Sequence, residues 1–194
     1  MNRKSYLILI SIFLLLTFLT GCLGGLSAED KEGISKKINL WVEGIKDKDD
    51  SKVYSAMIPQ GAIKSKIEYK DGSSLGNSFD NRDIYISNIT SSITWLYTKA
   101  EQFEIKNIVI SSGDNTVTVI ADFNSKSVFI NRDIIINLLE QDGYDVSLLR
   151  NDKSLQVVTM DSGKIVFKLL KIDDEWYINE FSLLDYTINY GYDK

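Results

Sequence analysis

The chain has 194 residues, no histidine, a single cysteine and a formal net charge of −5 at pH 7. The absence of histidine excludes Ser-His-Asp triads, histidine-based acid–base pairs and the commonest transition-metal ligand. With Cys22 as the only cysteine, intramolecular disulfides and a structural zinc site are excluded as well. Net acidity also argues against binding a phosphate backbone. We therefore expect no metal, no cofactor and no nucleic-acid partner.

The first 21 residues have the three zones of a secretory signal. Arg3 and Lys4 give a positive start, and residues 6–18 are apolar except for two hydroxyl side chains. This run is too short to span a bilayer comfortably, because a spanning helix needs about 20 apolar residues. Small residues follow it, as signal cleavage requires. We predict a signal peptide over residues 1–21.

Leu19-Thr20-Gly21-Cys22 resembles the lipobox of bacterial lipoproteins, and the resemblance covers residues 1–22. It implies that the Cys22 thiol receives a diacylglyceryl group, that cleavage makes Cys22 the first residue, and that the new amino group can also be acylated. Two acyl chains anchor a protein stably, at ~0.8 kcal/mol per buried CH₂. We expect a lipid anchor in the cell membrane on its extracytoplasmic face, which is the periplasmic side where there are two membranes. The alternative is an ordinary signal peptide or anchor helix that carries a cysteine by chance.

Cleavage would leave 173 residues, a length that suits one domain with a sizeable core. The removed piece contains Arg3 and Lys4 but no acid, so 20 Lys and Arg would remain against 27 Asp and Glu. Such a body is not attracted to anionic lipid, so the acyl chains must hold it. The predicted parts are a lipidated cysteine with a short tether (22–29), a single domain (30–184) and a C-terminal tail (185–194).

Helical periodicity dominates the first half of the domain. Ser27 to Asp30 resembles a capping box, and the apolar residues after it share one helical face: Ile34, Ile38, Trp41, Val42 and Ile45. A shorter helix follows the acidic turn at 47–50 and ends at Pro59. Residues 63–70 are predicted as an edge strand and 71–78 as a loop. A third helix is expected from about Asn81, with a buried stripe at Ile86, Ile89, Ile93, Leu96 or Tyr97, and Ala100.

After Glu101 the apolar period changes from helical to two, which indicates strands. Val117, Val119, Ala121 and Phe123 share one predicted strand face beyond a turn at 113–115. The later predicted elements are a short helix at 131–141, strands at 155–160 and 165–172 with a turn at 161–163, and a strand at 176–181 after the Asp173-Asp174 turn.

Two helices, a strand, a third helix and then a meandering sheet make an α+β order. Residues 38–45 with 47–57, and residues 167–178, resemble the nuclear transport factor 2-like superfamily. The resemblance spans most of residues 28–184 and implies a cone-like domain of three N-terminal helices packed on a curved antiparallel sheet. Relatives often pair through their sheets, so a homodimer is a further expectation. The helix at 131–141 departs from the family, and a different α+β domain is the alternative.

Superfamily enzymes of the ketosteroid isomerase type need no histidine, because a pocket carboxylate acts as the base beside hydroxyl or carboxylic-acid donors. The side chains that could supply such groups are Asp122, Glu101 and Glu180, with Tyr54 or Tyr97. No local motif matches those enzymes, so we assign no catalytic residue. Solvated positions on strands and helices are the alternative.

Aromatic residues have two further interpretations. The tryptophans at 41, 95 and 176 could ring a ligand cavity, but each lies in an amphipathic pattern, so we expect them in the core. The tail at 185–194 is rich in tyrosine, at 186, 190 and 192. It either offers a partner surface or packs as the end of the last strand and then frays.

The leading hypothesis is a membrane-anchored, non-catalytic domain that binds a small apolar molecule or a protein of the same envelope. The competing hypothesis is a histidine-free isomerase or dehydratase that uses buried carboxylates. The enzyme predicts a buried carboxylate inside a cavity with a tyrosine donor in reach, whereas binding or scaffolding predicts an apolar or filled cavity. A third hypothesis, a purely structural envelope protein, predicts no cavity and an exposed apolar patch.

Overall fold

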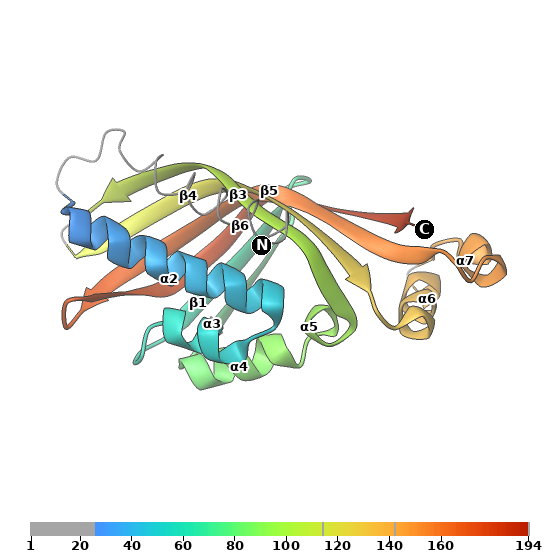
Figure 1. Cartoon of the computed structure of the whole chain (residues 1–194), viewed down its shortest axis with the longest axis horizontal. Coiled ribbons are helices and arrows are strands. Elements are labelled where there is room, and N and C mark those ends of the chain that lie inside the picture. The colour runs from blue at the N-terminus through green and yellow to red at the C-terminus, as the bar shows by residue number, and fades with distance from the viewer. Residues whose placement is uncertain (1–25, 114, 142, 194) are drawn as a thin grey trace, which may run out of the picture.

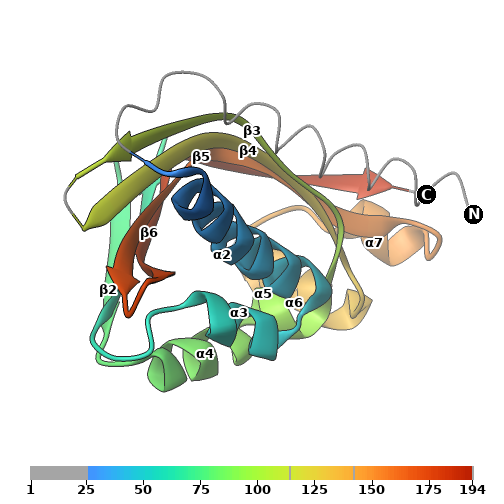
Figure 2. The ribbon, with the colours of Figure 1, turned by 60° about the vertical axis from the view of Figure 1, so that its left-hand side comes forward.

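A computed structural model describes residues 26–113, 115–141 and 143–193. In these residues the chain forms an α+β fold, with helices on the hollow face of a curved six-stranded sheet (Figures 1 and 2). The predicted signal peptide at 1–21 and the predicted lipidation site Cys22 lie outside the described residues. None of the helices that the structure describes is long and apolar enough to cross a membrane.

Helix α2 (Ala28–Asp47) is the helix predicted from its cap and apolar stripe. Ser27 Oγ accepts a hydrogen bond from the Asp30 backbone N–H, and the Asp30 carboxylate accepts one from the Ser27 backbone N–H, which completes the capping box. The residues of the stripe that are buried are Ile34, Ile38 and Trp41. The stripe faces the sheet, and Figure 2 shows α2 lying in its hollow.

Helix α3 (Asp50–Ala56) follows α2 after a tight turn and packs closely against it. A Cβ at Gly44 would lie 2.5 Å from Val53 Cγ2, so this crossing depends on a glycine in α2. The chain then leaves the helix before Pro59, as predicted.

The predicted third helix is in fact two helices, α4 (Arg82–Thr90) and α5 (Ile93–Tyr97). Ser92 starts the second one, because its Oγ accepts the Trp95 backbone N–H and so provides a new N-cap. Tyr85 is the buried residue of α4, although it lies outside the predicted stripe, and Ala100 belongs to a strand. Hydroxyl side chains that compete for backbone hydrogen bonds explain the break.

The sheet has the order β2-β1-β6-β5-β4-β3. Its strands are β1 (Ile63–Tyr69), β2 (Ser74–Phe79), β3 (Thr98–Ser112), β4 (Thr116–Phe129), β5 (Gln156–Ile172) and β6 (Glu175–Asp193). All neighbours are antiparallel except β1 and β6, which run parallel, so the prediction of an antiparallel sheet is wrong at that pair. The strand predicted at 63–70 is confirmed as β1, but it is not at the edge, because β2 forms the edge where a loop was expected.

The two predicted hairpin turns at 113–115 and 173–174 connect β3 to β4 and β5 to β6. Asp173 and Asp174 both have positive φ, 49° and 66°, as a two-residue hairpin loop of type I′ requires. The predicted inner face of β4 is confirmed, because all four of its residues are buried: Val117, Val119, Ala121 and Phe123.

Residues 161–163, predicted as a turn, lie within the single strand β5, where the pairing with β6 shifts register. Gly163 marks this bulge, because a Cβ there would lie only 2.7 Å from the Leu184 carbonyl oxygen. Asp185 on the facing strand has a φ of 52°. Strand β6 then continues to Asp193, so the predicted tail at 185–194 is largely strand.

Beyond the bulge the ends of β4, β5 and β6 carry a second, smaller unit, which we call the lobe (residues 129–157). It contains α6 (Arg132–Gln141), which confirms the predicted helix at 131–141, and α7 (Ser147–Asn151). Its core is separate from that of the rest of the domain, which we call the body, and consists of Ile135, Ile136, Leu139, Val146, Leu149, Leu155 and Val157. Figure 1 shows the lobe at the opposite end of the molecule from the start of α2.

Candidate functional site

Large side chains fill the hollow face of the sheet in the body. Phe167, Ile165 and Ile178 are fully buried there. The Trp41 ring packs edge-on against Phe167, with ring centroids 5.3 Å apart, and Trp41 Nε1 donates a hydrogen bond of 3.4 Å to the Tyr85 hydroxyl. The place where a cone-shaped fold could hold a ligand is therefore occupied by the protein itself.

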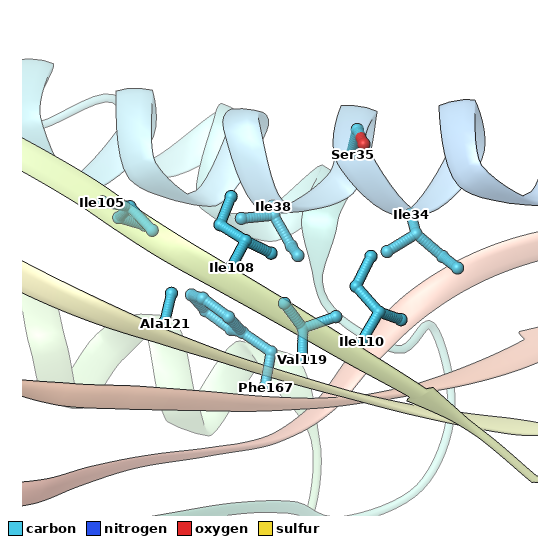
Figure 3. A pocket seen from close by; sticks show the side chains of 9 residues that line it. All are labelled: Ile34, Ser35, Ile38, Ile105, Ile108, Ile110, Val119, Ala121 and Phe167. Carbon is cyan, nitrogen blue, oxygen red and sulfur yellow. The ribbon is translucent and has the colours of Figure 1, made fainter. Parts of the chain in front are cut away.

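A small, partly enclosed cavity lies between α2 and the sheet, with a volume of about 20 Å³ (Figure 3). It has room for about one water molecule. Its lining is apolar except for one hydroxyl and consists of Ile34, Ser35, Ile38, Ile105, Ile108, Ile110, Val119, Ala121 and Phe167. A cavity of this size and lining offers neither space nor chemistry for an organic substrate.

A polar cluster lies on the same face of the sheet, at the bulge where the body meets the lobe. Asp161 on β5 faces Ser125 on β4, and the Ser125 hydroxyl donates a 3.1 Å hydrogen bond to Asp161 Oδ2. Asp161 Oδ1 is enclosed and has no partner within ordinary hydrogen-bond distance among the described residues. The hydroxyl of Tyr186 on β6 is near enough to influence this carboxylate.

The surroundings of this cluster change the proton affinities of both acids. Burial raises the pKa of Asp161, and the hydroxyls of Ser125 and Tyr186 offset part of that rise. Burial also raises the pKa of Tyr186, and the neighbouring charge of Asp161 raises it further. The pair therefore favours a protonated tyrosine beside a carboxylate that ionises reluctantly.

Aromatic rings pack together beside this cluster. The Phe123 ring stacks between Phe103 and Tyr186, with centroid distances of 6.2 Å on both sides. Tyr69 also packs against Tyr186, with ring centroids 5.5 Å apart. The enclosed cavity does not include Asp161, so the carboxylate and the cavity are two features rather than one active site.

The three carboxylates proposed from sequence do not come together in the structure. Asp122 accepts a 2.7 Å hydrogen bond from Asn107 and lies between the buried residues Ala121 and Phe123, so it points to the outer face of the sheet. The other two carboxylates form ion pairs with lysines, Glu101 with Lys126 at 2.9 Å and Glu180 with Lys168 at 2.7 Å.

The two candidate tyrosines are also away from these acids. Tyr54 lies under the Arg82 guanidinium, 3.8 Å from its ring centroid, and Tyr97 is at the end of α5. The tryptophans pack in or against the core, as predicted. Trp176 is buried and donates a 2.9 Å hydrogen bond to Asp30, which joins the start of α2 to the β5–β6 hairpin.

Sequence reasoning missed Asp161 and assigned Tyr186 to a tail. The Asp-Ser-Gly tripeptide at 161–163 has the composition of a turn, which hid the strand running through it. The alternation of a strand could have indicated the place of Asp161. Val157, Thr159 and Asp161 are separated from Ile165 by multiples of two residues, so in one continuous strand they share its face. Read in this way, Asp161 is a carboxylate on the buried face of a strand.

Metal binding has no support in the described part of the chain. No group of three or more Asp, Glu, His or Cys side chains gathers there in a way that could hold an ion. An open groove of about 400 Å³ on the outer face is lined by β1, β2 and Glu180. Of its charged side chains, Lys66 pairs with Glu68 and Glu180 pairs with Lys168, and Lys64 also lines it.

Exposed apolar side chains concentrate at the lobe and the adjoining strand ends. There they are Ile130, Tyr144, Leu148, Met160, Ile188, Tyr190 and Tyr192. Elsewhere Leu75, Ile84, Leu96, Val109 and Ile120 are spread over five separate elements. Large apolar side chains that remain exposed together mark surfaces that meet a partner more often than surfaces that do chemistry.

Comparison with solved structures shows that the chain has the fold of nuclear transport factor 2-like proteins. A protein of this superfamily from Salmonella enterica serovar Typhimurium is 12% identical, with 81% of this chain and 89% of that one covered and a TM-score of 0.54. A protein from Kribbella flavida is 11% identical, with coverage of 82% and 93% and a TM-score of 0.59. No protein-family model matches the sequence, and no curated protein matches it.

Proteins of the same fold include some whose names state an enzymatic activity. A hexachlorocyclohexane dehydrochlorinase is 9% identical over 84% of this chain and 88% of its own, with a TM-score of 0.51. At this identity the likeness concerns the fold alone, because one fold hosts many functions. The fold therefore allows both an enzyme and a binding domain, and the site must decide between them.

Proposed function

We propose that this protein is a lipoprotein, anchored on the extracytoplasmic face of the cell membrane through acyl chains on Cys22, whose domain binds a partner and does not catalyse a reaction. The observation that supports a binding domain, and not an enzyme, is that large side chains fill the hollow face of the sheet. The cavity between α2 and the sheet has a volume of about 20 Å³, whereas a site for a small organic ligand usually has a volume of several hundred.

The anchor rests on the residues before the domain. The positive start, the apolar run and the lipobox-like Leu19 to Cys22 support export followed by lipidation. Helix α2 begins at Ala28, so only residues 22–27 separate the proposed lipid from the domain. At ~3.6 Å per residue or less, this tether keeps the domain within about 20 Å of the bilayer surface.

An envelope protein is a better candidate partner than a small apolar ligand. A ligand in the hollow would have to displace buried aromatic side chains such as Trp41 and Phe167. A protein partner can use the apolar residues that are already exposed, at no such cost. Pairing of two copies through the outer face of the sheet, where Val109 and Ile120 are exposed, is a further proposal.

Metabolic labelling with an alkyne fatty acid tests the anchor. The wild-type protein should carry the label, run at the processed size and stay with the membranes. Cys22→Ser should lose the label and accumulate as the precursor. Labelling and membrane retention that survive this substitution would disprove the lipid anchor.

Native mass spectrometry tests the binding mode. The lipidated protein, released from membranes in mild detergent, should have the mass of the polypeptide plus its acyl chains. A second copy would appear as a doubled mass. A retained small molecule would contradict the proposal that the hollow is closed, and it would restore the ligand-binding hypothesis.

The Asp161 cluster favours one second candidate, an isomerase or dehydratase that uses a carboxylate and a tyrosine. A reluctantly ionised Asp161 beside the Tyr186 hydroxyl is the combination that such chemistry uses. Exchange of α-protons for deuterium in a panel of cyclic ketones, followed by NMR, measures this activity. We expect no exchange above that of Asp161→Asn, and exchange lost on this substitution would favour the enzyme.

A further inference from the structure

Asp161 lies at the junction between the body and the lobe, where β5 passes from one to the other. Toward the lobe, the next two residues on the inner face are Thr159, which is 5% exposed, and Val157, which belongs to the core of the lobe. Toward the body, a register shift at Gly163 interrupts the pairing of β5 with β6. A covered stretch of the inner face therefore runs from the carboxylate to the core of the lobe.

Three tyrosines connect this carboxylate to the helical part of the lobe. The Tyr186 hydroxyl lies close enough to Asp161 to lower its pKa, and Tyr190 lies close enough to Tyr186 to influence the pKa of that hydroxyl. The Tyr190 ring packs edge-on against the ring of Tyr144, with centroids 5.8 Å apart. Tyr144 lies between α6 and α7, so a displacement of these helices that separates the two rings also changes the surroundings of Asp161.

Hydroxyl groups are the polar neighbours of Asp161 on the inner face. Strand β4 contributes Ser125, β6 contributes Tyr186, and β1 contributes Tyr69, which packs against Tyr186. The charged residues of the adjoining strand segments lie on the outer face or are exposed at the bulge, and they are Lys126, Lys164 and Asp185. Among the described side chains, those that change the pKa of Asp161 are Ser125 and Tyr186, so no positive charge compensates an ionised carboxylate there.

Ionisation of Asp161 is therefore costly while the lobe covers it. The Ser125 hydroxyl satisfies Oδ2, but Oδ1 is enclosed without a partner among the described residues. A buried charge that lacks a counter-charge or a full set of hydrogen bonds is strongly unfavourable. Displacement of the lobe would uncover Thr159 and admit water to the carboxylate. The body would keep its own core, because the two cores are separate.

We propose that the protonation of Asp161 controls the lobe: α6 and α7 stay closed on the strand ends while the carboxyl group is neutral, and they open when it is charged, so that water solvates the charge. Burial raises the pKa of Asp161 in the closed state. The stability that the neutral acid gives to the closed state is therefore fully present below the open-state pKa and is lost as pH rises through the closed-state pKa. The lobe is closed in acid and opens toward neutral pH.

Opening would change the surface that the lobe offers to a partner. Core residues such as Leu149 would become accessible beside the exposed apolar side chains Tyr144 and Leu148. A partner that binds there would then bind in a pH-dependent way. This consequence rests on the proposed binding function, whereas the opening itself depends only on Asp161 and the lobe.

Hydrogen exchange of the full protein in mild detergent measures the opening. The pH is varied from about 4 to about 8, a range in which perturbed carboxyl groups titrate. Each rate is divided by the intrinsic rate of its amide at that pH. We expect protection over residues 132–157 to fall by about tenfold or more as pH rises, while α2 keeps its protection. Lobe protection that is independent of pH, or that falls together with that of α2, would overturn the proposal.

Two matched asparagine variants separate this carboxylate from the general charge of the sheet. Asp161→Asn keeps the shape of the neutral acid and can still accept the hydrogen bond from Ser125, so the lobe should stay protected over the whole pH range. Asp122→Asn makes the same change on the outer face of β4, where Asn107 donates to the carboxylate, and should keep the wild-type pH dependence. Protection in α2 shows that both variants are folded. A pH dependence that survives in Asp161→Asn, or that is lost equally in both variants, would contradict the proposed control.

The reverse effect distinguishes a group that is linked to the lobe from one that is merely buried, because linkage acts in both directions. Leu149→Ala removes a fully buried side chain from the core of the lobe and so favours opening. Carbon-13 NMR of labelled aspartate carboxyl groups should then report a lower pKa for Asp161 than in wild type, and Asp161→Asn identifies its signal. An unchanged pKa in a variant whose lobe exchanges faster would refute the link. None of these measurements involves a partner or a membrane, so their outcome is independent of the tests of anchoring and binding.

Discussion

The body and the lobe bury their apolar residues in different ways. In the body a 20-residue helix lies in the hollow of the sheet and packs on Phe167 and its neighbours. In the lobe two short helices cover only the ends of β4 and β5, around seven buried residues. The body and the lobe share one sheet but have separate hydrophobic cores. The two units can therefore differ in stability and in role.

Two hydrogen bonds from one side chain to backbone carbonyl oxygens help to hold the lobe together. The Arg132 guanidinium at the start of α6 donates to the carbonyl oxygens of Asp152 and Leu155, which joins α6 to the chain just before β5. The ion pair between Arg150 and Glu140 adds little stability to the lobe, because exposed ion pairs contribute little. We therefore expect the lobe to open at lower free energy than the body.

The largest effect is expected from Phe167→Ala in the body. Phe167 is fully buried at the centre of the sheet, so its removal leaves a cavity and should lower the free energy of unfolding by about 3–5 kcal/mol. Chemical denaturation followed by tryptophan fluorescence measures this, since Trp41 contacts the ring. A loss below about 1 kcal/mol would mean that the hollow is loosely packed and that the proposed closed site is wrong.

Leu149→Ala makes the matching change in the lobe. Leu149 is also fully buried, and the cost should be about 2–4 kcal/mol. The loss should fall on the lobe, so hydrogen exchange should speed up over residues 132–157 while α2 keeps its protection. Equal acceleration in both places would show one cooperative unit and abolish the distinction between body and lobe.

The sequence predicted best those elements whose periodicity is long and uninterrupted. The stripe of α2 and the alternation of β4 each run over many residues, so packing and local preference agree. β2 was missed because Ser74 to Phe79 has almost no apolar alternation and is defined by its backbone pairing with β1. Nothing in the sequence of β2 itself indicates that it pairs with β1.

The candidate site was predicted less well than the fold, for a related reason. The carboxylates chosen from sequence all lie on strands, and the position of Asp122 between two buried apolar neighbours places it on the outer face. Asp161 reaches the inner face only because β5 passes through its glycine without turning. Whether a glycine bends a strand or lets another backbone approach depends on Leu184, which is distant in the sequence.

Asp161→Asn tests the junction between body and lobe through its pH dependence. The folded-state pKa of Asp161 is raised by burial, so the stability that its protonated form contributes is fully present below the unfolded-state pKa and is lost as pH rises through the folded-state pKa. The variant cannot ionise, so it should gain stability relative to wild type as pH increases from acid to neutral. Thermal unfolding at several pH values measures this.

Tyr186→Phe is the control for that experiment. It removes the hydroxyl that offsets part of the burial cost but leaves the stacking on Phe123. The pKa of Asp161 should rise further, which moves the loss of stability to higher pH. A pH profile identical to that of wild type would show that Tyr186 does not act on the carboxylate.

The smallest effect is expected from Asp30→Asn, at the end of the body farthest from the lobe. Hydrogen bonds from Lys171, Ser27 and Trp176 hold the pKa of Asp30 well below its usual range. The stability this provides is present above the unfolded-state pKa and is lost as pH falls through the folded-state value. The variant lacks this contribution and part of the cap, so it should be somewhat less stable than wild type at neutral pH, by a modest amount because the Asp30–Lys171 pair is partly exposed. The difference should shrink on acidification, because the variant has no charge to lose. An acid titration followed by far-ultraviolet circular dichroism checks this, and an unchanged acid profile would mean that the contact between α2 and the β5–β6 hairpin is held by Trp176 packing and not by charge.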